Sequence, residues 1–101
     1  MTYQLRLYIT GRTSHSMRAI ENLQKICETA LKGCHEVEVI DVLENPRLAE
    51  NEKIMATPTL VRKLPEPVRK IIGDLSDHQK VLLSLDIFSV ERVLRDEEVG
   101  L

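Results

Sequence analysis

Two segments near the N-terminus alternate between apolar and polar residues. In residues 3–10, Leu5, Leu7 and Ile9 share one face of an extended chain, and polar or aromatic residues occupy the other. Residues 36–42 alternate at first and then become continuously apolar. Because a period of two is typical of a β-strand, the first segment is predicted to be a strand buried on at least one side, and the second a strand inside a sheet.

Residues 14–32, between these strands, have a helical period. Apolar residues recur there at the spacings of one helix face: Met17, Ile20, Leu23, Cys27, Ala30 and Leu31. Hydroxyl groups of Thr13, Ser14 and Ser16 can cap the start of this helix, and Gly33 is suited to its end. A strand, a helix of this length and a second strand form a right-handed βαβ unit, so we expect the two strands to be parallel.

Two further helices are predicted in the rest of the chain. Asn45 is suited to cap a helix that begins at Pro46, because the fixed φ of proline fits the first helical position. We expect this helix to end near Ile54. Ser76 is suited to cap a final helix over residues 77–95, where apolar residues form a broad stripe.

Two segments of the C-terminal half fit more than one period. Residues 56–75 hold three of the four prolines, and as strands they form a hairpin of 59–63 and 68–72. Their second half equally fits a helix that begins at Pro67. Residues 83–87 alternate strictly between apolar and polar side chains, as a strand does, although they lie inside the predicted final helix. Sequences that specify a single fold tend to avoid such conflicts, so the C-terminal half is compatible with two structures.

Composition indicates one ordinary globular domain that spans residues 1–101. The chain is 43% hydrophobic and 30% charged, with a net charge of -2 and only three aromatic residues other than histidine. Basic and acidic residues are interleaved, which argues against nucleic-acid binding. The sequence holds neither a signal peptide nor the roughly 20 apolar residues needed to span a bilayer, so we expect a cytoplasmic protein with no membrane partner.

The sequence shows no residue pattern that is typical of an enzyme active site. The turn at residues 11–16 would hold the reactive cysteines of a thioredoxin-like enzyme, but it contains none. Cys27 is interpreted as a small buried hydrophobic residue, whereas the exposure of Cys34 is left open. His15 is interpreted as a surface histidine, and no metal-binding spacing or phosphate loop occurs. We therefore expect a protein that is not an enzyme, with no catalytic residues, metal or cofactor.

Three blocks of sequence carry a specific resemblance to a known family. Residues 41–60, which end in Ala-Thr-Pro-Thr-Leu, residues 65–76, which hold Pro-Val-Arg-Lys-Ile-Ile-Gly-Asp-Leu-Ser, and Lys-Val-Leu at 80–82 resemble the KaiB family of circadian clock proteins. The resemblance implies a protein with two folds. One is the βαββααβ form, which is tetrameric in the family and is expected for the isolated chain. Whether this chain forms a dimer or a tetramer is left open. The other is a thioredoxin-like βαβαββα form bound to a partner.

The resemblance also implies a function. Residues 1–45 would form an invariant half and residues 46–95 a fold-switching half. The switched form would bind a KaiC-like ATPase ring of the RecA family and modulate its phosphorylation cycle or output, with a KaiA-like protein or a histidine kinase as further partners. The alternative is a thioredoxin-like binding module in stress adaptation or kinase signalling without a clock role.

Two sets of residues follow from this resemblance. The partner-binding set consists of Lys53, Arg18, Arg62, Arg69, Lys70 and Glu38. Glu38 stands where the family pattern has a basic residue, so its partner is expected to differ in charge. The fold-switch set consists of Pro58, Pro65, Pro67, Ser84 and Asp86. Isomerisation at the prolines is expected to contribute to the slow step, because its barrier is roughly 18–20 kcal/mol.

Overall fold

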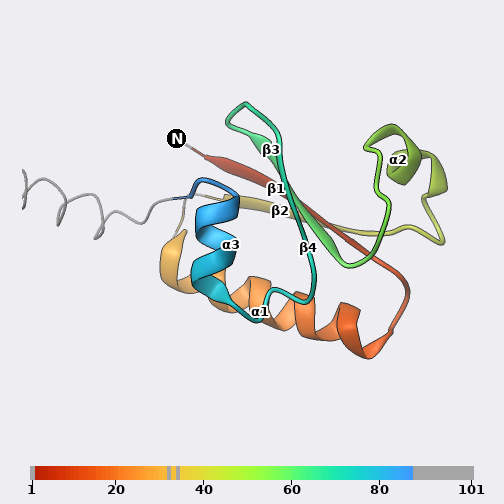
Figure 1. The fold of residues 1–101 in the computed structure, drawn as a ribbon, viewed down its shortest axis with the longest axis horizontal. Helices are drawn as coiled ribbons and strands as arrows, with labels where there is room; N and C mark the ends of the chain where they lie inside the picture. The colour runs from red at the N-terminus through yellow and green to blue at the C-terminus, as the bar shows by residue number, and fades with distance from the viewer. Residues whose placement is uncertain (1, 32, 34, 88–101) are drawn as a thin grey trace, which may run out of the picture.

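The fold was obtained as a computed structural model that describes residues 2–31, 33 and 35–87. Along the chain the elements are β1 (Tyr3–Ile9), α1 (Ser14–Ala30), β2 (His35–Asp41), α2 (Pro46–Asn51), β3 (Thr59–Leu64), β4 (Arg69–Ile72) and α3 (His78–Ser84). This is the thioredoxin-like order βαβαββα (Figure 1). The βαββααβ order expected for the isolated chain is not the one that this structure holds.

The four strands form one mixed sheet in the order β2-β1-β3-β4. The predicted parallel pairing of β1 and β2 is confirmed, with Leu7 opposite Val39. β3 runs antiparallel to β1, which places Leu60 opposite Leu7, and β4 runs antiparallel to β3. β2 and β4 are therefore the two outer strands, so the prediction that residues 36–42 form a strand inside the sheet is wrong, and β1 and β3 carry the centre of the core.

The two faces of the sheet are covered differently. Helices α1 and α3 cover one face, where Leu5, Leu7, Ile26, Leu60 and Leu85 belong to a single buried cluster (Figure 1). On the opposite face a smaller cluster of Tyr8, Ile40 and Val61 packs against residues from α2 and its flanking loops. Charged side chains on this second face are partly accessible: Arg6 of β1 is 30% exposed and Lys63 of β3 is 28% exposed.

Helix α1 begins as predicted and buries Leu23 and Cys27 as predicted, but the residues buried in its first turns differ. Thr13 is its N-cap and accepts a hydrogen bond from the backbone N–H of Ser16. Met17, predicted to be buried, is 46% exposed, whereas Ser16 and Ala19 are buried. Ser16 is tolerated inside because its hydroxyl accepts hydrogen bonds from the Thr10 N–H and the Thr13 hydroxyl.

The segment at 56–75 adopts the hairpin rather than the helix. β3 and β4 pair from Thr59 opposite Ile72 to Arg62 opposite Arg69. Pro58 directly precedes β3, and the other two prolines of the fold-switch set lie in the loop between the strands. The peptide bonds before Pro58, Pro65 and Pro67 are cis.

The final helix is shorter than predicted. Asp77, not Ser76, is its N-cap and accepts from the Lys80 N–H at 3.1 Å. The helix stops at Ser84, and the strand alternative for residues 83–87 is not adopted. The predicted continuation to residue 95 lies outside the described residues from position 88 onward. In the part of the chain that the structure describes, no helix is long and apolar enough to cross a membrane.

Candidate partner-binding site

Helix α2 ends in a left-handed turn at Lys53. Its φ of 57° is a backbone conformation that usually requires glycine. The Lys53 N–H donates to the carbonyl of Glu50 at 3.1 Å, and the Ile54 N–H donates to that of Ala49 at 2.9 Å. This pair of bonds is the Schellman motif, in which Glu52 is the C-cap. The predicted continuation of α2 to Ile54 is therefore wrong, because Lys53 reverses the chain.

The start of α2 differs from the prediction in one hydrogen bond. Asn45 is at the N-cap and Pro46 in the first turn, as predicted, but the Asn45 side chain makes no capping hydrogen bond. Its amide instead donates to the carbonyl of Asp41 at 3.2 Å, at the end of β2. No residue of α2 is buried. Partly buried Ala49 and Ile54 hold the helix against the sheet instead.

The Glu52 side chain joins α2 to two strands. Its carboxylate lies 2.9 Å and 3.1 Å from the ammonium of Lys63 on β3. On β1, the guanidinium of Arg6 is 3.6 Å from it, and the Tyr8 hydroxyl donates to it at 3.5 Å. The Glu52 side chain is only 14% exposed. The ammonium of Lys70 on β4 donates to the Glu52 carbonyl, so this one residue contacts three strands.

Burial and charge act together on the two β1 members of this cluster. Burial raises the pKa of the Tyr8 hydroxyl, and the Glu52 carboxylate adds to that rise while the Arg6 guanidinium opposes it. The pKa of Arg6 is raised, first by its interaction with the Tyr8 hydroxyl and also by the carboxylates of Glu38 and Glu52. Both groups are therefore held in their ordinary protonation states at neutral pH.

A hollow of about 480 Å³ lies beside Lys53. Lysines from three elements and apolar side chains line it: Lys53, Ile54, Met55, Thr59, Lys70, Ile71, Ile72 and Lys80. Met55 is 90% exposed and Ile72 is 64% exposed. We call the set of Lys53, Met55, Lys70, Ile72 and Lys80 the Lys53 surface. Cationic and apolar groups meet there, as at sites that bind an acidic partner.

The predicted site residues fall in different places. Lys53 and Lys70 come together on the Lys53 surface, and Arg69 is exposed next to Lys70 on β4. Met55, Ile72 and Lys80 were not predicted. The hydrophobic pattern assigns an apolar residue to the interior by default, so only the pairing of β3 with β4 reveals that Ile72 is exposed.

Arg62 is not available to a partner in this fold, contrary to expectation. It is 2% exposed and lies on the same face of β3 as Leu60. Its guanidinium donates to the carbonyls of Leu85 at 2.5 Å, Asp86 at 3.2 Å and Pro67 at 2.7 Å. Arg62 therefore caps the carbonyl end of α3, where a positive charge also interacts favourably with the helix dipole.

Arg18 contacts the chain's own C-terminal half. Its guanidinium is 3.7 Å from the carboxylate of Asp74, and the neighbouring Asn22 amide donates to the Asp74 carbonyl at 2.8 Å. Hydrogen bonds from Ser76 lower the pKa of Asp74 and thereby keep it charged. Arg18 is not among the residues that line the hollow beside Lys53.

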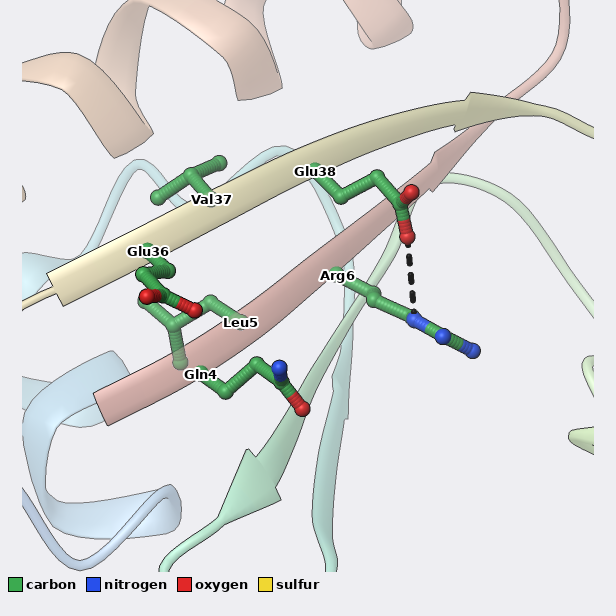
Figure 2. Close-up of a pocket in the computed structure, with 6 residues that line it drawn as sticks. All are labelled: Gln4, Leu5, Arg6, Glu36, Val37 and Glu38. Carbon is green, nitrogen blue, oxygen red and sulfur yellow. Dashed lines mark ion pairs between the residues drawn. The ribbon is translucent and has the colours of Figure 1, made fainter. Parts of the chain in front are cut away.

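Glu38 lies on the outer strand β2 and forms an ion pair with Arg6 at 3.1 Å (Figure 2). The two residues belong to the lining of a shallow pocket of about 370 Å³, together with Gln4, Leu5, Glu36 and Val37. Arg6 also contacts Glu52, so it connects Glu38 to the Glu52 cluster. The unexpected negative charge on this strand thus has a partner within the chain.

The last two fold-switch residues lie at the end of α3. Ser84 is the last residue of the helix, and Asp86 has a φ of 56°. The Asp86 N–H donates to the carbonyl of Leu83 at 3.2 Å, and the Ile87 N–H donates to the carbonyl of Leu82 at 2.8 Å. This pair of bonds is a second Schellman motif.

The described residues include one cysteine and no cluster of metal-binding side chains. Cys27 is a free, buried cysteine, as predicted, and burial raises the pKa of its thiol to about 11, with a further contribution from Glu28. Cys34 lies outside the described residues. Across residues 2–31, 33 and 35–87, no group of three or more histidine, cysteine or acidic residues is arranged to hold a metal ion.

Comparison with known families agrees with this arrangement. The KaiB domain family matches residues 6–87. The chain belongs to the KaiB family. A circadian clock oscillator protein KaiB from Picosynechococcus sp. is 56% identical over 98 residues, which cover 97% of this chain and 94% of the relative. The KaiB from Trichodesmium erythraeum is 53% identical over 100 residues, or 99% and 94% of the two chains.

Solved structures with the same fold include proteins of other kinds. The N-terminal domain of Synechococcus elongatus SasA superposes with a TM-score of 0.69 at 25% identity, over 82% of this KaiB chain and 80% of that domain. Mitochondrial thioredoxin 3 from Saccharomyces cerevisiae gives a TM-score of 0.68 at 18% identity, over 83% and 76%. The second likeness establishes the fold alone.

Proposed function

We propose that this KaiB-family chain is a non-enzymatic clock-type adaptor, which binds a KaiC-like ATPase ring in the thioredoxin-like form and modulates the ring's phosphorylation cycle or output. The observation that carries the proposal is the Lys53 surface. Three lysines and the exposed side chains of Met55 and Ile72 lie around one hollow. Relatives that are about 55% identical to this chain are named circadian clock oscillator proteins, which supports a clock role.

The Lys53 surface suits a protein partner better than a small ligand. Exposed large apolar side chains are unfavourable in water, and a partner that covers Met55 and Ile72 removes them from it. The lysines around them favour an acidic surface and accelerate its approach by electrostatic attraction. Binding through such a surface requires no catalytic group.

Binding and fold are coupled in this proposal. A partner that binds only the thioredoxin-like form stabilises it by about 2.7 kcal/mol when its concentration is 100 times Kd. Self-association of the free chain as a dimer or tetramer would stabilise the other form in the same manner. Residues 46–95 are the part that would change, since they hold α2, the hairpin and α3 together with the segments that fit two periods.

A second candidate is a thioredoxin-like binding module in stress adaptation or kinase signalling. The fold shared with the N-terminal domain of SasA and with thioredoxins favours it. The turn at residues 11–16 has no cysteine, so a binding role is more consistent with the chain than thiol exchange. This candidate predicts a stable partner other than a KaiC-type ATPase.

Reversing one charge on the Lys53 surface tests the proposal. Light scattering after size exclusion, and titration with a KaiC-type ATPase and ATP, should detect a complex with the wild-type chain. Lys53→Glu should weaken it by at least about tenfold, which is 1.4 kcal/mol. The control is Lys25→Glu, an exposed position on α1 that does not line the hollow, which should change the affinity less than about twofold. Absence of a wild-type complex, or equal losses in both variants, would contradict the proposal.

A further inference from the structure

We propose that Glu52 is the positioning residue of the Lys53 surface. Its carboxylate fixes the end of α2 against β1 and β3, and thereby orients the Lys53 side chain and the loop that follows it. This inference rests on the proposed function, because it concerns the same surface. The Glu52 side chain is only 14% exposed, so a partner bound to the Lys53 surface would scarcely contact it.

The first argument is that α2 cannot hold its own end. It has six residues, none of them buried, and isolated helices of this length are unstable in water. It then ends at a lysine in left-handed conformation, where a glycine would be favoured. Within the helix only Ala49 packs against the sheet, so the turn depends on contacts that Glu52 and Ile54 make after the helix has ended.

The second argument is the geometry of the Lys63–Glu52 pair. Both carboxylate oxygens of Glu52 lie within hydrogen-bond distance of the Lys63 ammonium, at 2.9 Å and 3.1 Å. The side chains are 14% and 28% exposed, so water screens this pair less than an ion pair on the open surface. These two charge-assisted contacts from one ammonium restrain the position of the Glu52 carboxylate.

The third argument is that the backbone of β3 is adapted to present Lys63. In the pairing with β1, Leu5 is opposite Arg62 and Gln4 is opposite Leu64, so Lys63 is the extra residue of an irregularity in the register. Bulges of this kind re-aim a side chain. Here the side chain meets Glu52 on the α2 face of the sheet.

The fourth argument links Glu52 to a second lysine of the surface. The Lys70 ammonium donates to the Glu52 backbone carbonyl. Two of the three lysines of the Lys53 surface are thus placed through this residue, Lys53 as its chain neighbour and Lys70 through a hydrogen bond. Holding these groups in place before binding reduces the ordering cost that a partner must offset.

The test compares Glu52→Gln with Glu50→Gln. Glu50 is an exposed acid two residues earlier, and its side chain makes no ion pair or hydrogen bond with any other residue that the structure describes. The reporters are the amides of Lys53 and Ile54, both hydrogen-bonded within the turn. Their hydrogen exchange should become about tenfold faster in Glu52→Gln and stay unchanged in Glu50→Gln, while amides of the β1–β2 pair keep their protection in both.

Binding to a KaiC-type ATPase with ATP supplies the second readout. Glu52→Gln should weaken it by about tenfold, and adding Lys63→Met to Glu52→Gln should cause little further loss, because the two residues act as one unit. Unchanged exchange of Lys53 and Ile54 would overturn the inference whether or not the ATPase binds. Faster exchange with unchanged affinity would also overturn it, because Glu52 would then be only structural. If the wild-type chain does not bind the ATPase, the proposed function is wrong, and so is the claim that Glu52 positions a surface for that partner.

Discussion

Lys53 and Asp86 occupy the same structural position at the ends of two different helices. Each is the first residue after the C-cap, with φ values of 57° and 56°, and each donates its N–H back to the last turn. An isoleucine follows each of them, Ile54 after α2 and Ile87 after α3, and closes the second hydrogen bond of the motif. Both left-handed turns lie within residues 46–95, the half that is predicted to switch fold.

Replacing Asp86 with glycine should stabilise the thioredoxin-like form. Glycine adopts a positive φ without the steric conflict of a Cβ atom, so we expect a gain of about 0.5–1 kcal/mol in unfolding free energy. The matched control is Ser84→Gly, two residues earlier in the last helical turn, which should cost about 0.5–1 kcal/mol. Urea unfolding of the isolated domain measures both. Changes of the same sign would contradict the left-handed geometry at Asp86.

Replacing Lys53 with glycine should separate stability from binding. The left-handed turn should gain about 0.5–1 kcal/mol for the same reason as at Asp86. The same substitution removes the cation of the Lys53 surface, so affinity for a KaiC-type ATPase should fall by about tenfold. Urea unfolding and titration with the ATPase measure the two effects. A variant that is more stable and binds as well as the wild type would remove Lys53 from the site.

Replacing Arg62 with methionine should destabilise this fold by about 2 kcal/mol. The methionine preserves much of the buried volume but leaves the carbonyls of Leu85, Asp86 and Pro67 without their donor. Arg69→Met is the control, because Arg69 pairs with Arg62 across the hairpin and is exposed. It should change the unfolding free energy by less than about 0.5 kcal/mol. Equal effects in chemical denaturation would exclude the capping role of Arg62.

The Cys27 thiol should be nearly unreactive at pH 8. With a pKa of about 11 against an ordinary value of 9.0, only about 0.1% of it is thiolate at that pH. Iodoacetamide labelling of a Cys34→Ser variant, native and in urea, isolates this group. The native rate should be at least about tenfold lower than the unfolded rate. Fast native labelling would contradict the burial of Cys27.

The same thiol makes stability fall at high pH. Below pH 9 it is protonated in both states, and its contribution to stability is fully present. As the pH rises from 9 through 11, the unfolded state loses the proton first, so the folded state becomes less favoured. Comparing the wild type with Cys27→Ala over this range should show a decline that is steeper in the wild type.

The N-terminal half could be predicted because its signals are local. The alternation in residues 3–10 and the cap at Thr13 fix β1 and the start of α1 without reference to the rest of the chain. The error at Met17 came from choosing the helix face by apolar character alone. The hydroxyl of Ser16 is satisfied by Thr10 and Thr13, and that network could not be predicted from helical spacing.

The C-terminal half could be predicted only as a pair of alternatives. Antiparallel pairing of β3 with β1 selects the hairpin here, and this long-range contact leaves no mark in the local period. The interior position of Arg62 had a signal, because it is two residues from Leu60 and therefore on the same face of a strand. No sequence signal indicated the role proposed for Glu52, because that role depends on contacts with three strands near the end of α2.

Nuclear magnetic resonance of the isotope-labelled chain, alone and saturated with a KaiC-type ATPase ring and ATP, tests the central claim most directly. In the complex, cross-strand contacts between Leu60 and Ile71 should report the β3–β4 hairpin, and the largest signal changes should fall on Lys53, Met55 and Ile72. A bound chain with a βαββααβ order, or with the Lys53 surface unperturbed, would contradict the account.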